Sequence, residues 1–419
     1  MVRASHRLPV LDALRMVAAL WVFLAHAAFA ENYFRTGDTV PLDPTATTGL
    51  REIVRTGWMG VDLFFVISGI VITRTAVGRS AAEFIVARFS RIAPSFLVGV
   101  TIAILITFFL GGQGTTPYNG FATIPDLLPS FTLLNYPLGS EVTAEPSYWT
   151  LWTEAKFYAL VALCLLVCRV GTRRTIIIFL TLWLFAVILL HEGPQPTLTA
   201  LLLTPFAPYF ILGAVLGMVR NRRELLLLSP LLLASVVMAA AAAEARGAFA
   251  TGTSTACVVV LSAAVVAGLL VKGSDSRLSR TATALGLASF PLYLLNYRFG
   301  GLIVGALQSR GVGIGVALVV GSAVLVTVAY LWASRVEPHL QRRLKDAMVA
   351  GLCEFRPEPR PVTGAPAATV PDEPRRTVPA DETMPVPAVR APHHDRAQGH
   401  GDAPSRPEDR TRLAAHSAP

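Results

Sequence analysis

Charged residues are scarce in this chain of 419 residues: only 15% of them are Asp, Glu, Lys or Arg, against about 25% in soluble globular proteins. Lysine is nearly absent and occurs only at Lys156, Lys272 and Lys345. Cysteine is rare too, with four residues. Hydrophobic residues make up 53% of the chain, and the mean hydropathy is +0.54. The low charge excludes a soluble enzyme, and the few cysteines exclude a secreted disulfide scaffold.

Long apolar runs take the place of the missing charge. Residues 175–190, 225–243 and 311–333 are almost entirely apolar, and about 18 such residues in a row indicate a membrane-spanning helix. We therefore predict an all-α integral membrane protein with about ten transmembrane helices. The expected spans lie near residues 10–30, 57–75, 92–111, 148–168, 174–191, 199–219, 225–243, 253–271, 283–307 and 312–335.

The formal net charge of +9 is unevenly distributed over the connections between these spans. Arginine and lysine gather after the second, fourth, sixth, eighth and tenth spans, whereas segments 112–147 and 192–197 contain neither. The positive-inside rule then predicts cytoplasmic N- and C-termini and an even number of spans, with the arginine-containing loop 31–56 as an exception. Residues 1–30 resemble a signal peptide, but Asp12 and Arg15 interrupt the apolar centre, so we expect a retained first helix.

The chain divides into two parts by composition. Residues 1–350 form the predicted transmembrane domain, and residues 351–419 are rich in Pro, Ala and Arg without apolar periodicity. We expect the second part to be a disordered cytoplasmic tail. Nucleic-acid binding is not expected, because the arginines lie at helix ends and not on one face. Cys164 and Cys168 have no His or carboxylate at metal-ligand spacing, so we expect packed thiols and no metal site.

Ionisable residues within the spans are candidates for function, because their burial in a membrane is costly. Arg15 and His26 are eleven positions apart in the first span, which places them on one helix face, about 16 Å apart along the axis. Asp12 precedes Arg15 by three positions and is expected to pair with it. The alternative for His26 is a simple hydrogen bond to a neighbouring helix, but the shared face with Arg15 favours function.

Three other places within the spans hold polar groups, and each has a structural alternative. Asp62 is either functional or an interfacial helix cap, and Ser68 with Gly69 could form a small-residue helix contact. Trp149 and Trp152 are expected at the membrane interface, and Glu154 is expected one to two turns deep in the membrane, at about the depth of His26 and on one face with Tyr158. Pro291 is expected to kink the ninth span, where Asn296 and Arg298 either function or form a polar helix contact.

These depths separate two groups of side chains. His26, Asp62 and Glu154 are expected on the outer side, and Arg15, Arg88 and Arg91 on the inner side. A group of arginines on the inner side suits a phosphorylated ligand. A histidine near carboxylates suits proton transfer to or from a hydroxyl. The residues alone therefore suggest a membrane transferase with its donor inside and its acceptor outside.

The same residues resemble the motifs of the integral-membrane acyltransferase 3 family. They are an Arg and a His separated by ten residues (Arg15, His26), the stretch GVDLFFVISG at 60–69, Arg88, Arg91 and Pro94 before the third span, Trp-x-Leu-x-x-Glu-x-x-Phe-Tyr at 149–158, and SFPLYL at 289–294. The match covers roughly residues 8–343 in family order. One departure matters: the late motif often ends in His, and here Asn296 stands in that place.

The resemblance implies a ten-helix enzyme of the bacterial inner (plasma) membrane. It would move an acyl group, usually acetyl from acetyl-CoA, to a hydroxyl of a cell-envelope glycan, a glycolipid or a macrolide-type glycoside. Arg15, Arg88 and Arg91 would bind the acyl-CoA. Loops 31–56 and 112–147 would shape the acceptor site. No extra extracytoplasmic hydrolase-like domain is visible in the sequence, so the protein would act directly or with a separate partner.

For the chemistry, His26 would be the general base, oriented by Glu154 or Asp62. A covalent acyl-histidine is the competing route. The alternative class is a transporter or lipid-binding scaffold without catalysis. Against it stands the absence from the sequence of paired broken helices in corresponding halves.

Overall fold

The structure, a computed structural model, describes residues 9–36, 56–110, 124–138, 143–169, 171–190, 196–246, 253–270 and 277–354. All of them belong to one compact unit, Met1–Pro357. Most of the predicted tail, most of loop 31–56 and part of loop 112–147 lie outside the described residues. Residues 351–354, placed in the tail from the sequence, continue the last helix.

The described residues are mostly helical and contain no strand. The helices are α1 (Pro9–Thr36), α3 (Met59–Ala76), α4 (Ala81–Leu110), α5 (Ile124–Leu127), α6 (Trp149–Cys168), α7 (Arg173–Leu190), α8 (Pro196–Leu201), α9 (Ala207–Met218), α10 (Arg222–Ala245), α11 (Thr253–Leu270), α12 (Arg277–Leu295), α13 (Arg298–Gln308), α14 (Ile314–Leu331) and α15 (Glu337–Glu354). Two short 3₁₀ helices, η1 (Leu128–Phe131) and η2 (Pro146–Tyr148), precede α6, and a π-helical turn, η3 (Trp332–Val336), joins α14 to α15.

The helices agree with the predicted spans in position, with two differences. Within the described residues, seven helices are long and apolar enough to cross a membrane, and the pair formed by α12 and α13 would be an eighth. This pair is bent by 76°, so the predicted span 283–307 is broken. The apolar helix Ala207–Met218 and the apolar stretch Thr255–Leu269 are shorter. The count of ten and the cytoplasmic termini therefore stay predictions.

Glycines set the closest helix contact, which joins α3 to α9. A Cβ atom on Gly213 of α9 would lie 1.8 Å from the carbonyl oxygen of Val66, and one on Gly69 of α3 would lie 2.2 Å from that of Phe210. Such close approach is typical of membrane helices that pack through small residues. The small-residue contact that the sequence allowed at Gly69 is therefore present, and it buries α3 in the centre of the bundle.

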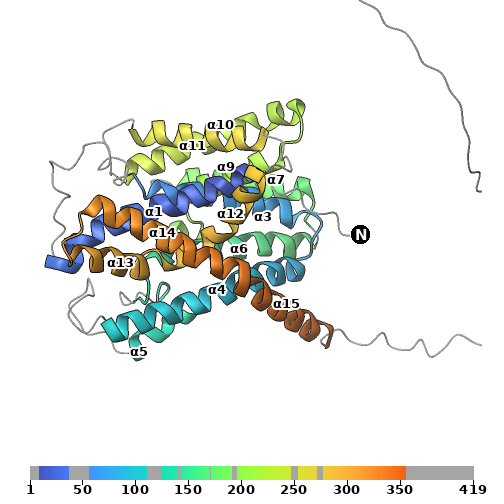
Figure 1. Cartoon of the computed structure of the whole chain (residues 1–419). Coiled ribbons are helices and arrows are strands. Elements are labelled where there is room, and N and C mark those ends of the chain that lie inside the picture. The colour runs from blue at the N-terminus through green and yellow to red at the C-terminus, as the bar shows by residue number, and fades with distance from the viewer. Residues whose placement is uncertain are drawn as a thin grey trace, which may run out of the picture. The chain divides into compact units, whose positions relative to one another are not determined.

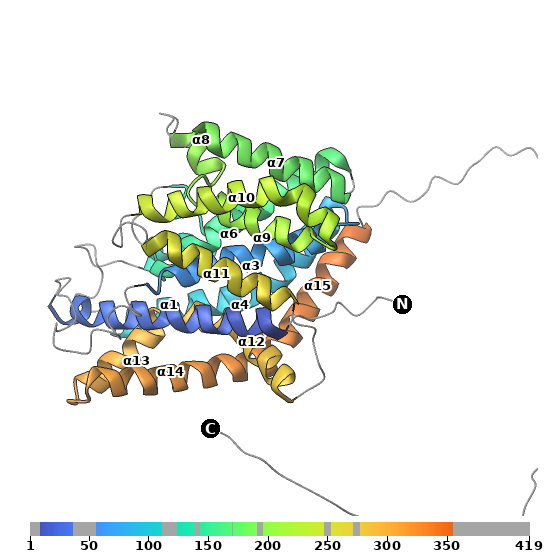
Figure 2. The same ribbon diagram turned by 90° about the horizontal axis from the view of Figure 1, so that it is seen from above.

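Figures 1 and 2 show the helices side by side in a bundle, with α1 and α3 running in opposite directions. We call the end at which α1 begins and α3 ends the basic end, because it carries Arg74, Arg79 and Arg173. The continuous run Ile314–Gly351 through α14, η3 and α15 has 38 residues, or about 57 Å at the helical rise per residue. It exceeds the roughly 30 Å of a bilayer core. Consequently α15 projects from the basic end (Figure 1).

Candidate active site

His26 contacts the break between α12 and α13. Its Nδ1 lies 2.5 Å from Oδ1 of Asn296, and its ring meets the ring of Tyr297 edge to face, with centroids 5.2 Å apart. The side-chain nitrogen of Asn296 donates to the main-chain carbonyl of Tyr293. A carbonyl only accepts hydrogen bonds, so this bond fixes which way the amide points. Oδ1 therefore faces His26 and requires a proton on Nδ1.

The direction of the Asn296 amide determines the chemistry that His26 can perform. When a neutral imidazole carries its proton on Nδ1, its lone pair lies on Nε2. Within the described part of the chain, no side chain hydrogen-bonds Nε2, and the ring is half-buried. His26 thus offers a proton acceptor at Nε2 while Asn296 holds the opposite edge of the ring.

The helix break that brings Asn296 to His26 is stabilised by the segment before α6. The main-chain N–H of Arg298, the first residue of α13, lies 3.4 Å from both carboxyl oxygens of Glu145, and Nε of Arg298 donates to the Ala144 carbonyl at 3.1 Å. Burial raises the pKa of Glu145 to about 8, against the opposite influence of the Arg298 charge. The bend occurs at Asn296 and Tyr297 and not at Pro291, which lies inside α12.

Glu154 does not lie near His26. Its Oε1 accepts hydrogen bonds from the Ser68 hydroxyl and, at 2.5 Å, from the Tyr158 hydroxyl. Gly60 marks the level at which α3 crosses Ala18 and Val22 of α1. Along α3, Ser68 lies eight residues beyond Gly60 in the direction of the basic end. Along α1, His26 lies four residues beyond Val22 in the opposite direction. These intervals sum to about 18 Å along the bundle.

The prediction that Glu154 shares the depth of His26 is therefore wrong, and so is the idea that Glu154 orients it. The predicted depth of Glu154 assumed that α6 starts at the membrane surface. Instead, Glu145, Ser147 and Tyr148 are at most 2% exposed, and the Tyr148 hydroxyl donates to the Leu294 carbonyl on α12 at 3.1 Å. Helix α6 thus begins inside the protein, which displaces Glu154 toward the basic end.

Asp62 is bound by a residue that the sequence analysis did not single out. Arg246, directly after α10, donates from both terminal nitrogens to the Asp62 carboxylate at 2.9 and 2.8 Å. The same guanidinium bonds the Tyr209 hydroxyl at 2.6 Å and lies over the Trp58 ring, 4.4 Å from its centroid. The carboxylate is 1% exposed. Asp62 is thus bound to Arg246, and among the described residues the side chain that hydrogen-bonds His26 is Asn296. That Asp62 orients His26 stays a prediction.

The three arginines predicted on the inner side gather around Glu154 and Tyr158. Arg15 lies within electrostatic reach of Glu154, Tyr158 and Arg91, and Arg88 within reach of the same three residues. Arg88 is buried and donates from Nη2 to the Thr75 hydroxyl at 2.9 Å. Its Nε has no hydrogen-bond partner among the described residues. A buried guanidinium with an unused donor suits an anionic group.

Some residues of this region carried only a weak signal in the sequence, or none. Arg246 and Glu145 each lie next to a helix and not within it, so neither stands out as a charged residue inside a span. Tyr209 gives no signal in an apolar helix. Among the described residues, no group of three or more His, Cys, Asp or Glu side chains could hold a metal ion.

Comparisons with known proteins bear on these residues. A family model described as an acyltransferase domain matches residues 8–334, most of the chain. "Acyltransferase MdmB" of Streptomyces mycarofaciens is 35% identical over 156 residues, which are 36% of this chain and 38% of that protein. "Nodulation protein 10" of Rhizobium leguminosarum bv. viciae is 33% identical over 160 residues, or 35% and 41% of the two chains. The matches thus span about two fifths of the length of these curated relatives. No solved structure matches the chain.

Proposed function

The chain belongs to the integral-membrane acyltransferase 3 family, and from this premise we propose that it is a membrane O-acyltransferase. The donor is acyl-CoA, with acetyl-CoA as the expected form. The acceptor is a hydroxyl of a carbohydrate-containing molecule, such as a cell-envelope glycan, a glycolipid or a macrolide-type glycoside. The protein acts in a bacterial plasma membrane, with both termini in the cytoplasm. The observation that carries the proposal is the His26–Asn296 pair, which leaves Nε2 available as a base.

Arg15, Arg88 and Arg91 bind the phosphates of the donor in this proposal. Arg88 supports it most strongly, because it is a buried cation with an unpartnered Nε. Arg15 and His26 lie on the same uninterrupted helix, α1. The eleven positions that separate them correspond to about 16 Å. The pantetheine arm would extend along this distance, so that the phosphates stay at the basic end while the thioester reaches His26.

His26 performs the proton transfers. Nε2 accepts the proton of the acceptor hydroxyl as its oxygen attacks the thioester carbonyl. The tetrahedral intermediate then collapses, the bond between the carbonyl carbon and sulfur breaks, and the imidazolium returns its proton to the departing thiolate. During both proton transfers, Asn296 holds the imidazole ring in position by its hydrogen bond with Nδ1. A general base of this kind contributes about 10²–10⁴-fold to the rate.

The two carboxylates receive supporting roles. Glu154 orients and partly neutralises the arginines that surround it, because it lies within electrostatic reach of Arg15 and Arg88. Asp62 holds Arg246, and with it the end of α10, against α3. In this proposal neither carboxylate contacts the reacting atoms.

The test is the release of the coenzyme A thiol by the purified full-length protein in nanodiscs. Acetyl-CoA is supplied with a panel of glycan, glycolipid and macrolide acceptors. We expect one acceptor class to increase the release several-fold over water alone. If no acceptor does so and acetyl-CoA also fails to bind in equilibrium dialysis, the enzyme is excluded in favour of a transporter or lipid-binding scaffold.

A second measurement separates the general-base route from a covalent acyl-histidine. Acetyl-CoA labelled in the acetyl group is added without acceptor, and the protein is denatured at once. General-base chemistry predicts no label on the protein and no burst of thiol release. Stoichiometric label that is absent from His26→Ala would instead establish the covalent route.

A further inference from the structure

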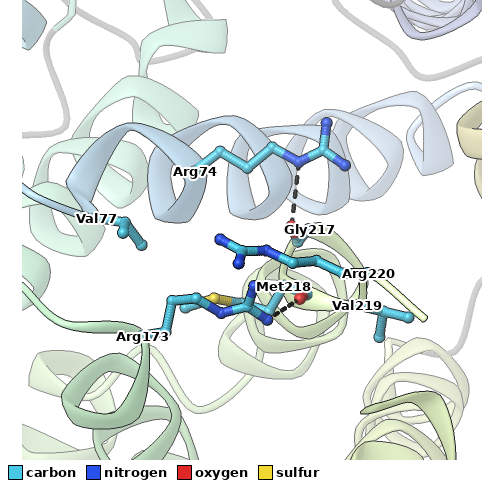
Figure 3. Close-up of a pocket in the computed structure, with 7 residues that line it drawn as sticks. All are labelled: Arg74, Val77, Arg173, Gly217, Met218, Val219 and Arg220. Carbon is cyan, nitrogen blue, oxygen red and sulfur yellow. Dashed lines mark hydrogen bonds between the residues drawn. The ribbon is translucent and has the colours of Figure 1, made fainter. Parts of the chain in front are cut away.

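A second cluster of arginines lines a cavity at the basic end, separate from the residues assigned above. The cavity has a volume of about 330 Å³ and opens where α3 and α9 end and α7 begins. Figure 3 shows the side chains of Arg74, Arg173 and Arg220 at this cavity, with the guanidinium groups of Arg173 and Arg220 next to each other and that of Arg74 farther away. Its lining residues are Arg74, Val77, Arg173, Gly217, Met218, Val219 and Arg220.

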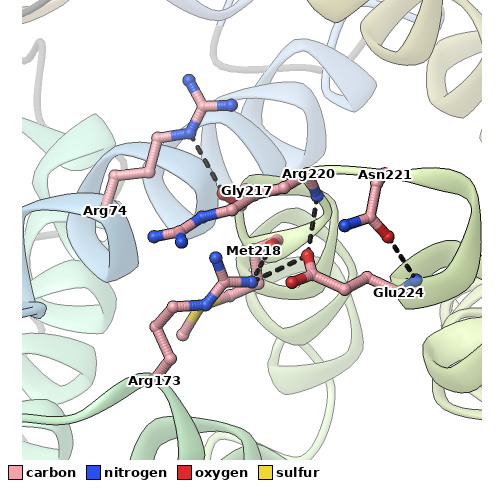
Figure 4. Close-up of polar contacts among 7 residues, drawn as sticks. All are labelled: Arg74, Arg173, Gly217, Met218, Arg220, Asn221 and Glu224. Carbon is pink, nitrogen blue, oxygen red and sulfur yellow. Dashed lines mark hydrogen bonds and ion pairs between the residues drawn. The ribbon is translucent and has the colours of Figure 1, made fainter.

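Two of these arginines are fixed by the end of α9. Nε of Arg74 donates to the Gly217 carbonyl at 3.1 Å, and Nη2 of Arg173 donates to the Met218 carbonyl. Both carbonyls lack partners within the helix because α9 ends at Met218. These bonds have a structural function, but each uses only one nitrogen of a group that carries five N–H donors. Figure 4 shows both side chains held by these bonds, with the terminal nitrogens of Arg74 pointing away from the guanidinium groups of Arg173 and Arg220.

Arg220 has no comparable structural function. Its main-chain N–H donates to Glu224 at 2.8 Å. Its guanidinium lies between those of Arg74 and Arg173 in Figure 3, without a hydrogen-bond partner among the described residues. Glu224, whose carboxylate also accepts from Arg173 at 2.9 Å, compensates one of the three positive charges. The cluster therefore retains an uncompensated charge of about +2, which repels itself unless an anion is present.

We propose that the cavity between Arg74, Arg173 and Arg220 binds a phosphate-bearing anion. A phosphate monoester carries a charge of about −1.5 to −2 near neutral pH and offers three acceptor oxygens. These properties match the uncompensated charge and the neighbouring guanidinium groups of Arg173 and Arg220, since guanidinium groups bind phosphate in a planar, bidentate manner. Thr75, next to Arg74 in α3, is the partner of Arg88, so both groups of arginines contact the end of α3 at the basic end.

Two sources can supply such a phosphate at this place, the nucleotide end of coenzyme A and the headgroup of an anionic phospholipid. Only the first rests on the proposed acyltransferase function. The experiment uses the full-length chain with Arg220→Gln, which removes no intramolecular bond of the side chain. Arg223→Gln is the matched control, because it removes the same charge three residues away, in the first turn of α10, at an exposed residue that does not line the cavity.

The first arm measures binding of coenzyme A and of 3′-dephospho-coenzyme A by calorimetry in phosphatidylcholine nanodiscs. The second counts phosphatidylglycerol and phosphatidylcholine molecules that remain on the protein in native mass spectrometry. A tenfold or greater loss of coenzyme A affinity in Arg220→Gln alone, smaller with the dephospho form, assigns the cavity to the nucleotide 3′-phosphate. A selective loss of bound phosphatidylglycerol assigns it to a lipid headgroup.

If Arg220→Gln and Arg223→Gln behave alike in both arms, the phosphate site does not exist. Failure of the acyltransferase function would look different. Thiol release would then be absent, whereas the lipid arm would still distinguish the two variants.

Discussion

The most informative single substitution is Asn296→Leu. It keeps the size of the side chain but removes the bond between Oδ1 of Asn296 and Nδ1 of His26, which spans 2.5 Å. During the reaction His26 becomes cationic, so the lost bond is charge-assisted and contributes about 1.5–3 kcal/mol. At about 1.4 kcal/mol per tenfold change in rate, kcat should fall by about 10–150-fold. The assay is acceptor-dependent thiol release, with melting temperature as the control for folding.

Asn296→Asp distinguishes positioning from a merely structural effect. It preserves an acceptor for Nδ1 and adds a negative charge, which favours the imidazolium form of His26. We expect kcat near that of the wild type at neutral pH, with the acidic limb of the pH–rate profile displaced to higher pH. If Asn296→Leu retains kcat within twofold of the wild type, or if neither variant alters the pH profile, Asn296 does not position His26.

Three further predictions concern the helix contacts and the two carboxylates. Gly213→Ala places a Cβ 1.8 Å from the Val66 carbonyl oxygen. It should lower the melting temperature by an amount equivalent to about 3 kcal/mol. Gly305→Ala is the control and should not lower it, because no atom lies within 4 Å of the new Cβ. Equal melting temperatures of the two variants would contradict the α3–α9 contact. Asp62→Asn leaves the Arg246 charge without its partner and should lower the free energy of unfolding by about 3 kcal/mol. Adding Arg246→Gln should restore part of this stability. An unchanged melting temperature of Asp62→Asn would show that the ion pair is absent. Glu154→Gln should raise KM for acetyl-CoA more than it lowers kcat, and the reverse pattern would place Glu154 at the chemical step.

The sequence predicted the fold class and the places of the helices, because apolar runs report directly on burial in a membrane. It also predicted that Arg15, Arg88 and Arg91 would gather. Those three residues lie near the ends of their predicted spans, where the order of the spans along the chain determines depth. Ser68 and Glu154, which stood out as polar residues within spans, bind each other.

Relative depth between helices could not be read from the sequence in the same way. It depends on where each helix starts, and α6 starts at Trp149 inside the protein, after buried residues that include Glu145. It also depends on contacts such as that of Gly60 with Ala18. Asn296 was seen as a polar residue that departs from the family motif. That it contacts His26, 270 positions away, required the structure.

The sequence predicted a kink at Pro291, whereas the 76° bend of the structure lies after the end of α12. Pro291 removes one N–H from the helix but remains within it. The chain turns at Asn296 and Tyr297, where Glu145 is available to accept the first N–H of α13. A helix ends where other groups can satisfy its free main-chain atoms. In this protein those groups come from a segment about 150 residues earlier, which no local pattern reveals.

The most direct test of the central claim compares His26→Ala with His339→Ala, an exposed histidine on α15. Each variant is supplied with labelled acetyl-CoA and the acceptor identified by thiol release, and acylated acceptor is counted by mass spectrometry. We predict that His26→Ala keeps its melting temperature and its affinity for acetyl-CoA but loses at least 100-fold in acylated product, while His339→Ala equals the wild type. Acylated product within a few-fold of the wild type in His26→Ala would contradict the assignment of His26 as the catalytic base.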